Sequence, residues 1–211
     1  MIVNEIFHSI QGESTRAGLP CTFVRLTGCN LRCVYCDTAY AFYDGREMTV
    51  TAVADEVKRL GCAFVTVTGG EPLLQPEVHA LMGRLADSGC DVQVETSGAI
   101  DITPVDPRVR VILDIKTPGS GMMDRMDWMN LGRLRPGDEV KVVLTGRGDY
   151  EWARERIAAG GIPGDTPVLL SPSHGVLDPR ELADWITADR LPVRLQLQLH
   201  KYVWGADARG V

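Results

Sequence analysis

The chain has 211 residues, of which 45% are hydrophobic and 24% are charged, and its formal net charge is −6. This length predicts a single domain over residues 1–211 with a full hydrophobic core. The acidic balance and the lack of a basic run exclude an extended nucleic-acid surface, which needs an excess of Lys and Arg. No apolar run approaches the ~20 residues that span a bilayer, and residues 1–14 lack the features of a signal peptide. We therefore expect a cytoplasmic protein with reduced thiols and no membrane partner.

Apolar, β-branched runs alternate with helical patterns along the chain. Seven runs predict strands, over residues 21–28, 62–69, 91–96, 110–116, 139–145, 166–172 and 194–200. Apolar residues at helical spacing predict helices between several of them, over 50–60, 78–85, 149–159 and 178–188. The last helix opens with Asp178 as a cap and Pro179 in its first turn. Repeated strand–helix–strand units predict an α/β fold with a mostly parallel sheet. Seven strands are too few for a closed barrel of ~250 residues, so we expect an open, partial βα barrel with a shortened core.

The six cysteines are unevenly distributed. Cys21, Cys62 and Cys90 stand alone in apolar surroundings, which predicts buried core thiols. The other three, Cys29, Cys33 and Cys36, fall within eight residues directly after the first predicted central strand. The carboxyl ends of parallel strands are where α/β folds place their sites.

Three thiolates at this spacing can surround one soft metal centre. A structural zinc site needs four protein ligands, so zinc would require a distant fourth ligand such as Cys62 or Cys90. On a four-iron cluster, three cysteines leave one iron free to bind a small molecule. Both interpretations predict a metal centre on the Cys29–Cys36 segment.

A second motif follows the strand predicted over 62–69. Its residues are Gly69, Gly70, Glu71 and Pro72. Glycines at a strand end let the backbone approach a ligand closely, and the Glu71 carboxylate is suited to accept hydrogen bonds from an ammonium group. Alone, the motif is also typical of an ordinary turn between a strand and a helix.

The two motifs together resemble those of the radical S-adenosylmethionine (SAM) superfamily. The resemblance rests on the spacing of Cys29, Cys33 and Cys36, on Tyr35 before the last cysteine, and on residues 69–72. It implies a partial barrel of the radical SAM type and a [4Fe-4S] cluster on the three cysteines. It also implies that SAM binds the open iron and is cleaved to a 5′-deoxyadenosyl radical. The cluster and SAM carry this chemistry, so no separate catalytic side chain is expected.

From about residue 3 to the C-terminus, the chain resembles the 7-carboxy-7-deazaguanine synthase family. The resemblance rests on the segments 6–14, 21–26, 36–38 and 197–205. It implies a carbon–nitrogen lyase that contracts the ring of 6-carboxy-5,6,7,8-tetrahydropterin to 7-carboxy-7-deazaguanine and releases ammonia. The product is the 7-deazapurine core used in queuosine biosynthesis. The resemblance further implies a homodimer and an electron donor such as flavodoxin or ferredoxin.

The same resemblance assigns roles to individual residues. Substrate contacts are implied for Ile10, Gln11, Gly12, Glu13, Arg25, Thr68, Glu95 and Val211. SAM contacts are implied for Tyr35, Cys36, Asp37, Gly70, Asp114, Ile115, Lys116, Ser171, Pro172, Ser173 and His174. A Mg²⁺ ion is implied on Thr38, with Asp37 alongside, because magnesium takes few protein oxygens together with substrate groups and water.

Each side-chain role has an ordinary structural alternative. Arg25 offers a fork for a carboxylate but also suits an ion pair, and Glu13 suits a loop carboxylate. Lys116 also fits a solvated loop lysine, and Asp37-Thr38 also fits a helix or turn cap. For His8 and His200 we expect structural roles, and for Trp128, Trp152, Trp185 and Trp204 core or interface positions.

Two rival functions share parts of this pattern. An activase of a glycyl-radical enzyme is also a small radical SAM protein, but it gives no reason for the segments at 9–14 and 200–205. A non-catalytic iron–sulfur or zinc module would use the cysteines alone. Cleavage of SAM by the reduced protein excludes the module, and turnover of a small pterin excludes the activase.

Overall fold

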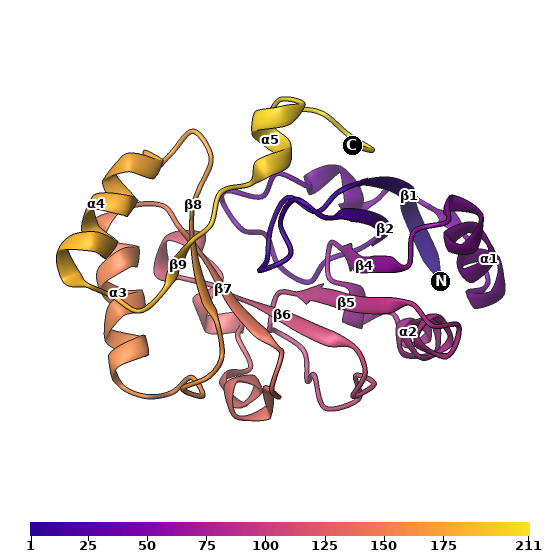
Figure 1. The fold of residues 1–211 in the computed structure, drawn as a ribbon, viewed down its shortest axis with the longest axis horizontal. Coiled ribbons are helices and arrows are strands. Elements are labelled where there is room, and N and C mark those ends of the chain that lie inside the picture. Colours follow the sequence, from indigo (N-terminus) through magenta and orange to yellow (C-terminus); the bar gives the residue numbers. More distant parts are fainter.

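The computed structural model describes all 211 residues, Met1–Val211, and is built on one open nine-stranded sheet (Figure 1). The strands lie in the order β3-β1-β2-β4-β5-β6-β7-β8-β9. Their bounds are β1 Ile2–Ile10, β2 Pro20–Leu26, β3 Arg46–Glu47, β4 Phe64–Gly69, β5 Asp91–Thr96, β6 Arg110–Ile115, β7 Glu139–Leu144, β8 Val168–Pro172 and β9 Arg194–Leu195. From β2 to β9 all neighbours are parallel, whereas β1 is antiparallel to both β2 and β3.

Five α-helices accompany the sheet, and none is long and apolar enough to cross a membrane. They are α1 Val50–Leu60, α2 Glu77–Asp87, α3 Arg147–Ala158, α4 Pro179–Asp189 and α5 Leu199–Val203. The predicted cap of α4 is present, because the Asp178 side chain accepts from the Arg180 N–H at 2.8 Å. The connection between β6 and β7 holds only 3₁₀ turns, at Pro118–Ser120, Met123–Arg125 and Trp128–Arg133, and the connection between β5 and β6 holds no helix. The barrel is therefore shortened there.

One hydrophobic core lies between the sheet and the helices. It is a single cluster of 31 buried residues, which includes Val67 and Val94 of the sheet, Leu81 of α2 and Leu182 of α4. Since side chains alternate across a strand, the neighbouring positions project to the other face. On that inner face lie polar residues such as Thr68, Glu95, Asp114, Glu139 and Lys141, which the helices do not cover.

The predicted α/β partial barrel and its four longer helices are confirmed, and two local predictions need correction. Strand β1 was missed, because its stability comes from antiparallel pairing with β2 rather than from a continuous apolar run. The strand predicted over 194–200 was wrong beyond its first two residues. Only Arg194 and Leu195 pair with β8; the chain then leaves the sheet, and the Leu199 N–H donates to the Gly12 carbonyl at 2.9 Å.

Candidate active site

A cavity of about 620 Å³ opens on the inner face of the sheet, at the carboxyl ends of the parallel strands. Most residues singled out in the sequence line it, although they come from distant segments. The lining includes Ile10, Gln11, Gly12, Glu13, Arg25, Cys29, Cys33, Tyr35, Cys36, Asp37, Thr38, Thr68, Gly70, Glu95, Asp114, Lys116, Ser173, His174 and Val211. Figure 1 shows that α5 and the C-terminal residues lie on the side of the molecule where β1 and β2 lie, so both ends of the chain come to this cavity.

The loop that follows β2 brings three thiols to this cavity. Gly28 turns the chain with a φ of 94°, and its N–H donates to the Ala41 carbonyl at 2.9 Å. Burial raises the pKa of Cys29, of Cys33 and of Cys36, and the neighbouring thiolates raise those of Cys29 and Cys33 further. The thiols therefore lie within electrostatic range of one another. Their thiolate forms require compensating positive charge, which iron ions supply.

No group of three His, Cys, Asp or Glu side chains is gathered closely enough to hold a single metal ion by itself. The donor set nevertheless fits a [4Fe-4S] cluster with one open iron, because all three sulfurs border one cavity wide enough for a ligand. Cys62 and Cys90, the candidate fourth ligands of a zinc site, do not line it.

The lone cysteines lie away from the cavity. Cys21 is fully buried, and burial raises its pKa to about 12. Cys62 and Cys90 are only half-buried, near the amino ends of β4 and β5. The prediction of full burial was wrong for both, although Cys90 packs against the hydrophobic core. The connections that enter these strands leave the ends partly open to solvent.

Gly70 allows the backbone after β4 to pass directly beside the cysteine loop. A β-carbon at Gly70 would lie 2.2 Å from the Gly28 carbonyl oxygen and 2.8 Å from Cys29 Cβ. The Glu71 N–H donates to that same carbonyl at 2.8 Å. The glycine is therefore required by a close approach of two chain segments.

Glu71 does not face the cavity, in contrast to the expectation that its carboxylate accepts from an ammonium group. It is fully buried, and its oxygens accept from the Leu73 N–H at 3.0 Å, Thr96 Oγ1 at 2.9 Å, the Ser97 N–H at 2.7 Å and Ser97 Oγ at 2.5 Å. These four bonds tie the turn after β4 to the end of β5. The carboxylate thus shapes the site, and the Gly69–Gly70 backbone lines it.

A set of buried and half-buried charged side chains also lines the cavity. Glu13 pairs with Lys141, and Asp114 lies with Oδ2 3.0 Å from Lys116 Nζ and 3.7 Å from Lys141 Nζ. Burial raises the pKa of Glu95 to about 7, the Glu13 charge adds to this rise, and Lys141 opposes it. Two carboxylate oxygens, Glu13 Oε1 and Asp114 Oδ1, are buried without a partner. They face a cavity in which a ligand with N–H groups would satisfy them.

Gln11 and Arg25 are both held by protein partners. Gln11 Nε2 donates to Thr66 Oγ1 at 2.9 Å and to Glu95 Oε1 at 3.3 Å, while its Oε1 accepts from the Glu13 N–H. Arg25 Nε donates to Glu5 Oε1 at 2.7 Å. One edge of the guanidinium therefore forms an ion pair, as the structural alternative for this residue predicted. Arg25 also borders the cavity, where its other nitrogens remain for a ligand.

Asp37 and Thr38 link the cysteine loop to α5. Burial would raise the pKa of Asp37, but the Lys201 ammonium at 2.5 Å and hydrogen bonds from Gln198 and Thr38 lower it well below the usual range. Thr38 Oγ1 donates to Asp37 Oδ1 at 3.0 Å and makes no capping bond to the following 3₁₀ turn. The capping alternative for Thr38 is therefore wrong, and two oxygen donors lie together at the cavity wall.

Lys116 lies over the Tyr35 ring, 5.9 Å from its centroid. Burial would lower the pKa of Lys116, but Asp114 and other anionic neighbours raise it. The alternative of a solvated loop lysine is therefore wrong.

Three residues with implied SAM contacts do not line the cavity. Ile115 packs in the hydrophobic core because it points to the other face of β6, and the Ser171 side chain is buried in β8. Pro172 borders a smaller neighbouring cavity, which it shares with His174.

Several cavity residues were missed in the sequence. Lys141 is the main one, because nothing in the run 139–145 marks a lysine that faces inward. Gln198 lies in the segment predicted as a strand over 194–200 and Lys201 follows directly after it, and both donate to Asp37. His200 also lines the cavity, and burial lowers its pKa, whereas His8 is exposed on β1. Three tryptophans, Trp128, Trp152 and Trp185, pack against the core, and Trp204 is partly exposed.

Comparison with known proteins places the chain in a family. The model of the radical SAM superfamily matches residues 23–169. The 7-carboxy-7-deazaguanine synthase of Chlorobaculum tepidum is 48% identical over 212 residues, which cover 99% of this chain and 96% of that protein. The enzyme of the same name from Koribacter versatilis is 43% identical, with both chains fully covered. The chain belongs to the 7-carboxy-7-deazaguanine synthase family.

Solved structures agree on the fold. The crystal structure of QueE from Escherichia coli matches with a TM-score of 0.78 and 23% identity over 94% of each chain. Streptococcus suis SuiB bound to S-adenosylmethionine matches with a TM-score of 0.57 and 12% identity, over 86% of this chain and 53% of that one. As a radical SAM enzyme, this family member uses a [4Fe-4S] cluster and SAM.

Proposed function

We propose that this enzyme converts 6-carboxy-5,6,7,8-tetrahydropterin to 7-carboxy-7-deazaguanine and releases ammonia. The observation that carries the proposal is the composition of one cavity. It is bordered by the cysteine loop with Gly70 and also by Gln11, Glu13, Arg25 and Glu95. The near full-length relatives, which are named for the product, support the same reaction.

The cluster side of the cavity holds the cofactor. When bound, the cluster and SAM supply a 5′-deoxyadenosyl radical that abstracts a substrate hydrogen. We assign Cys29, Cys33 and Cys36 to the cluster. SAM is assigned to the cavity wall formed by Tyr35, Asp37, the Gly70 backbone, Asp114, Lys116, Ser173 and His174.

The opposite side fits the substrate. A pterin edge is rich in N–H donors, and the unpartnered Glu13 Oε1 is a buried acceptor for one of them. Arg25 offers its remaining guanidinium nitrogens to the substrate carboxylate. The remaining substrate contacts are assigned to Ile10, Gln11, Gly12, Thr68, Glu95 and Val211, which line the same space.

We assign a Mg²⁺ ion to Thr38, with Asp37 beside it. The Thr38 hydroxyl and the ionised Asp37 carboxylate are hard oxygen donors at the cavity wall, as magnesium prefers. In this role Thr38 turns its hydroxyl from Asp37 toward the ion, while Lys201 continues to hold Asp37.

The wider setting of the reaction is part of the proposal. A low-potential donor such as flavodoxin or ferredoxin reduces the cluster, and the chain works as a homodimer of single-domain subunits. All six cysteines are free, which supports a reducing compartment such as the cytoplasm.

The decisive experiment is an anaerobic reaction of the reconstituted protein with 6-carboxy-5,6,7,8-tetrahydropterin, SAM, Mg²⁺ and dithionite. Mass spectrometry should detect 7-carboxy-7-deazaguanine and 5′-deoxyadenosine together. Formation of 5′-deoxyadenosine alone would leave the protein a radical SAM enzyme with a different substrate. Omission of the pterin is the matched control, because it isolates uncoupled cleavage of SAM.

A further inference from the structure

The loop of residues 11–19, which joins β1 to β2, crosses the inner face of the sheet. We call it the floor loop, because it carries Gln11 and Glu13 along the bottom of the cavity. Gln11 binds Thr66 of β4 and Glu95 of β5. Further along, the Thr15 N–H donates to Glu139 Oε2 of β7 at 2.9 Å, and the Thr15 hydroxyl binds the other Glu139 oxygen.

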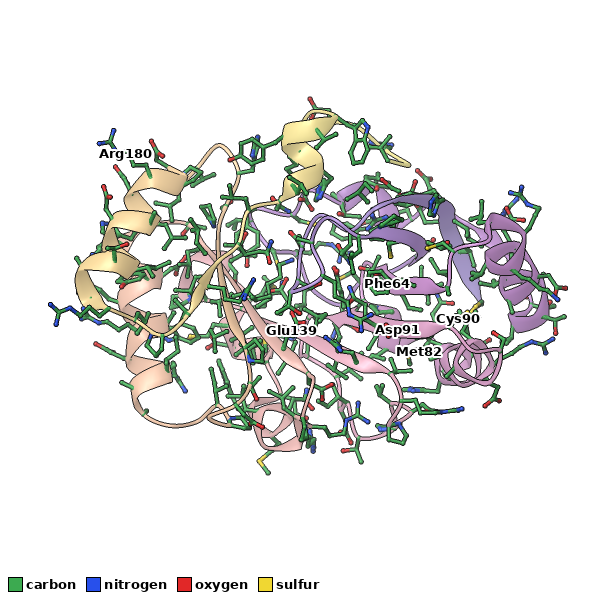
Figure 2. The ribbon with its side chains drawn as sticks, viewed as in Figure 1. Phe64, Met82, Cys90, Asp91, Glu139 and Arg180 are labelled. Atoms are coloured by element: carbon green, nitrogen blue, oxygen red, sulfur yellow. The ribbon has the colours of Figure 1, made fainter.

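Arg16 fastens the same loop at the amino ends of β4 and β5. It forms an ion pair with Asp91, and its guanidinium lies 4.8 Å from the Phe64 ring centroid. Figure 2 labels Phe64, Asp91 and Glu139, which are the first residues of β4, β5 and β7. The floor loop is therefore held by side chains of β4, β5 and β7, strands that lie beyond its own hairpin of β1 and β2.

Lys141 lies two residues after Glu139 on β7 and projects to the same face. Its ammonium pairs with Glu13 Oε2 and lies 3.7 Å from Asp114 Oδ2. The same Asp114 oxygen forms an ion pair with Lys116 Nζ at 3.0 Å. One oxygen of each carboxylate is thus engaged by lysine. The other oxygens, Glu13 Oε1 and Asp114 Oδ1, are buried without a partner at the cavity.

We propose that Lys141 is a positioning residue. Its ammonium, fixed on β7, holds one oxygen of the Glu13 carboxylate on the floor loop, so that the other oxygen, Oε1, accepts an N–H of the substrate. The proposal rests on the proposed function, since it assumes a substrate with N–H donors in this part of the cavity. Glu139 lies two residues before Lys141 on β7, and it supports the same arrangement by accepting hydrogen bonds from Thr15. Lys141 itself acts through Glu13 and need not touch the substrate.

The physical reason lies in the charge arrangement. A carboxylate on a loop rotates freely unless one oxygen is engaged by a fixed partner, and a buried ion pair in good geometry provides such a partner. Lys141 is on a central strand, with Val140 and Val142 of the same strand in the hydrophobic core. Its ammonium stays charged at neutral pH, because the Glu13, Asp114 and Glu95 carboxylates outweigh the effect of burial and raise its pKa.

The first test compares Lys141→Met with Lys58→Met, because Lys58 is exposed on α1 and carries no ion pair. In the anaerobic assay, Lys141→Met should raise the KM for the pterin by at least about tenfold, as expected when a buried charge loses its partner. Cluster content, the KM for SAM and uncoupled formation of 5′-deoxyadenosine should stay within about twofold of the parent. Lys141→Arg should recover part of the loss, and Lys58→Met should behave as the parent.

A second variant avoids the risk that Lys141→Met fails to fold. Thr15→Val removes only the hydroxyl bond to Glu139 and keeps the shape of an exposed residue. It should raise the KM for the pterin by about threefold to tenfold without changing the KM for SAM. Thr187→Val is the matched control, since Thr187 is exposed on α4 and its side chain makes no hydrogen bond.

The outcomes separate the two proposals. If the parent forms no 7-carboxy-7-deazaguanine, the proposed function fails, whatever the variants do. If the parent is active and folded Lys141→Met has the parental KM for the pterin, the positioning role is overturned and the function stands. Equal losses for SAM and for the pterin would show a merely structural lysine and also overturn it. If Lys141→Met does not fold, a parental KM in Thr15→Val overturns it.

Discussion

At the scale of single residues, the absence of a side chain at Gly70 allows the backbone after β4 to pack directly against the cysteine loop. Alanine there would place its β-carbon 2.2 Å from the Gly28 carbonyl oxygen, a backbone atom that cannot move alone. We expect Gly70→Ala to displace the cysteine loop, lower the iron content and cost about 1–3 kcal/mol of unfolding free energy. Gly132→Ala is the control, because no atom lies within 4 Å of its added carbon. Parental iron content in Gly70→Ala would contradict the close approach.

The six cysteines should divide into two functional groups. Replacing Cys29, Cys33 or Cys36 by alanine should remove the cluster of about four irons and abolish SAM cleavage. Cys21→Ala, Cys62→Ala and Cys90→Ala should do neither, because their thiols lie outside the cavity. Iron analysis and absorbance of anaerobically reconstituted protein provide the measurement. Loss of the cluster in Cys62→Ala or Cys90→Ala would mean that a fourth cysteine is a ligand.

Glu95 should make stability depend on pH. Its pKa rises from 4.5 to about 7 in the folded chain, so between these values the folded state binds more protons than the unfolded state. The free energy of unfolding should therefore fall as pH rises from about 4.5 to about 7, by at most about 3 kcal/mol, and level off above. Glu95→Gln should lack this component in urea titrations at pH 5 and pH 8. An equal pH dependence in both proteins would contradict the raised pKa.

At the scale of elements, the Glu71 side chain links the turn after β4 to the carboxyl end of β5. Its carboxylate accepts four hydrogen bonds from the turn after β4 and the end of β5. Glu71→Gln replaces one acceptor oxygen by an NH₂ group that faces buried donors. It should cost about 2 kcal/mol or more, measured by denaturant unfolding.

The matched control for Glu71→Gln is Glu155→Gln, an exposed position of α3. It should change stability by less than about 0.5 kcal/mol. Equal effects of the two substitutions would mean that the link between β4 and β5 contributes little.

At the scale of the whole molecule, the cavity is completed by segments from both halves of the chain. Arg25 comes from β2, whereas Gly210 and Val211 come from the segment after α5, and all three border the same space. Arg25→Ala, or deletion of Gly210 and Val211, should spare cluster assembly and SAM affinity. Each should depress product formation by tens- to thousands-fold, as expected for a loss of about 2–5 kcal/mol.

The measurement for these two variants is paired. Deazapurine product and 5′-deoxyadenosine are quantified in one anaerobic reaction, and slow uncoupled cleavage of SAM should persist. Arg25→Ala also frees Glu5 from its ion pair, so thermal unfolding is recorded alongside. Parental rates of product formation would show that neither segment holds the substrate.

Local patterns made much of this protein predictable. The apolar periodicity of α1 to α4 and the runs of β4 to β8 follow from which face each element buries, and burial is the dominant local constraint. The cysteine spacing predicted a metal centre, because close spacing in sequence imposes closeness in space. The resemblance of the cysteine spacing and residues 69–72 to the radical SAM motifs then predicted the cofactor class. Conversely, β1 and α5 were missed or misassigned, since antiparallel pairing and contact with Gly12 decide their conformations.

The sequence by itself determined the class of fold, the cluster motif and the family, because each rests on short local patterns that can be identified segment by segment along the chain. Only the tertiary structure decided that Glu71 is a buried link and that Lys141 pairs with Glu13 across 128 positions. It also brought Lys201 to Asp37. The physical reason is that a side chain's partners, burial and pKa are set by whatever the folded backbone places beside it, and those neighbours come from strands and loops distant in sequence.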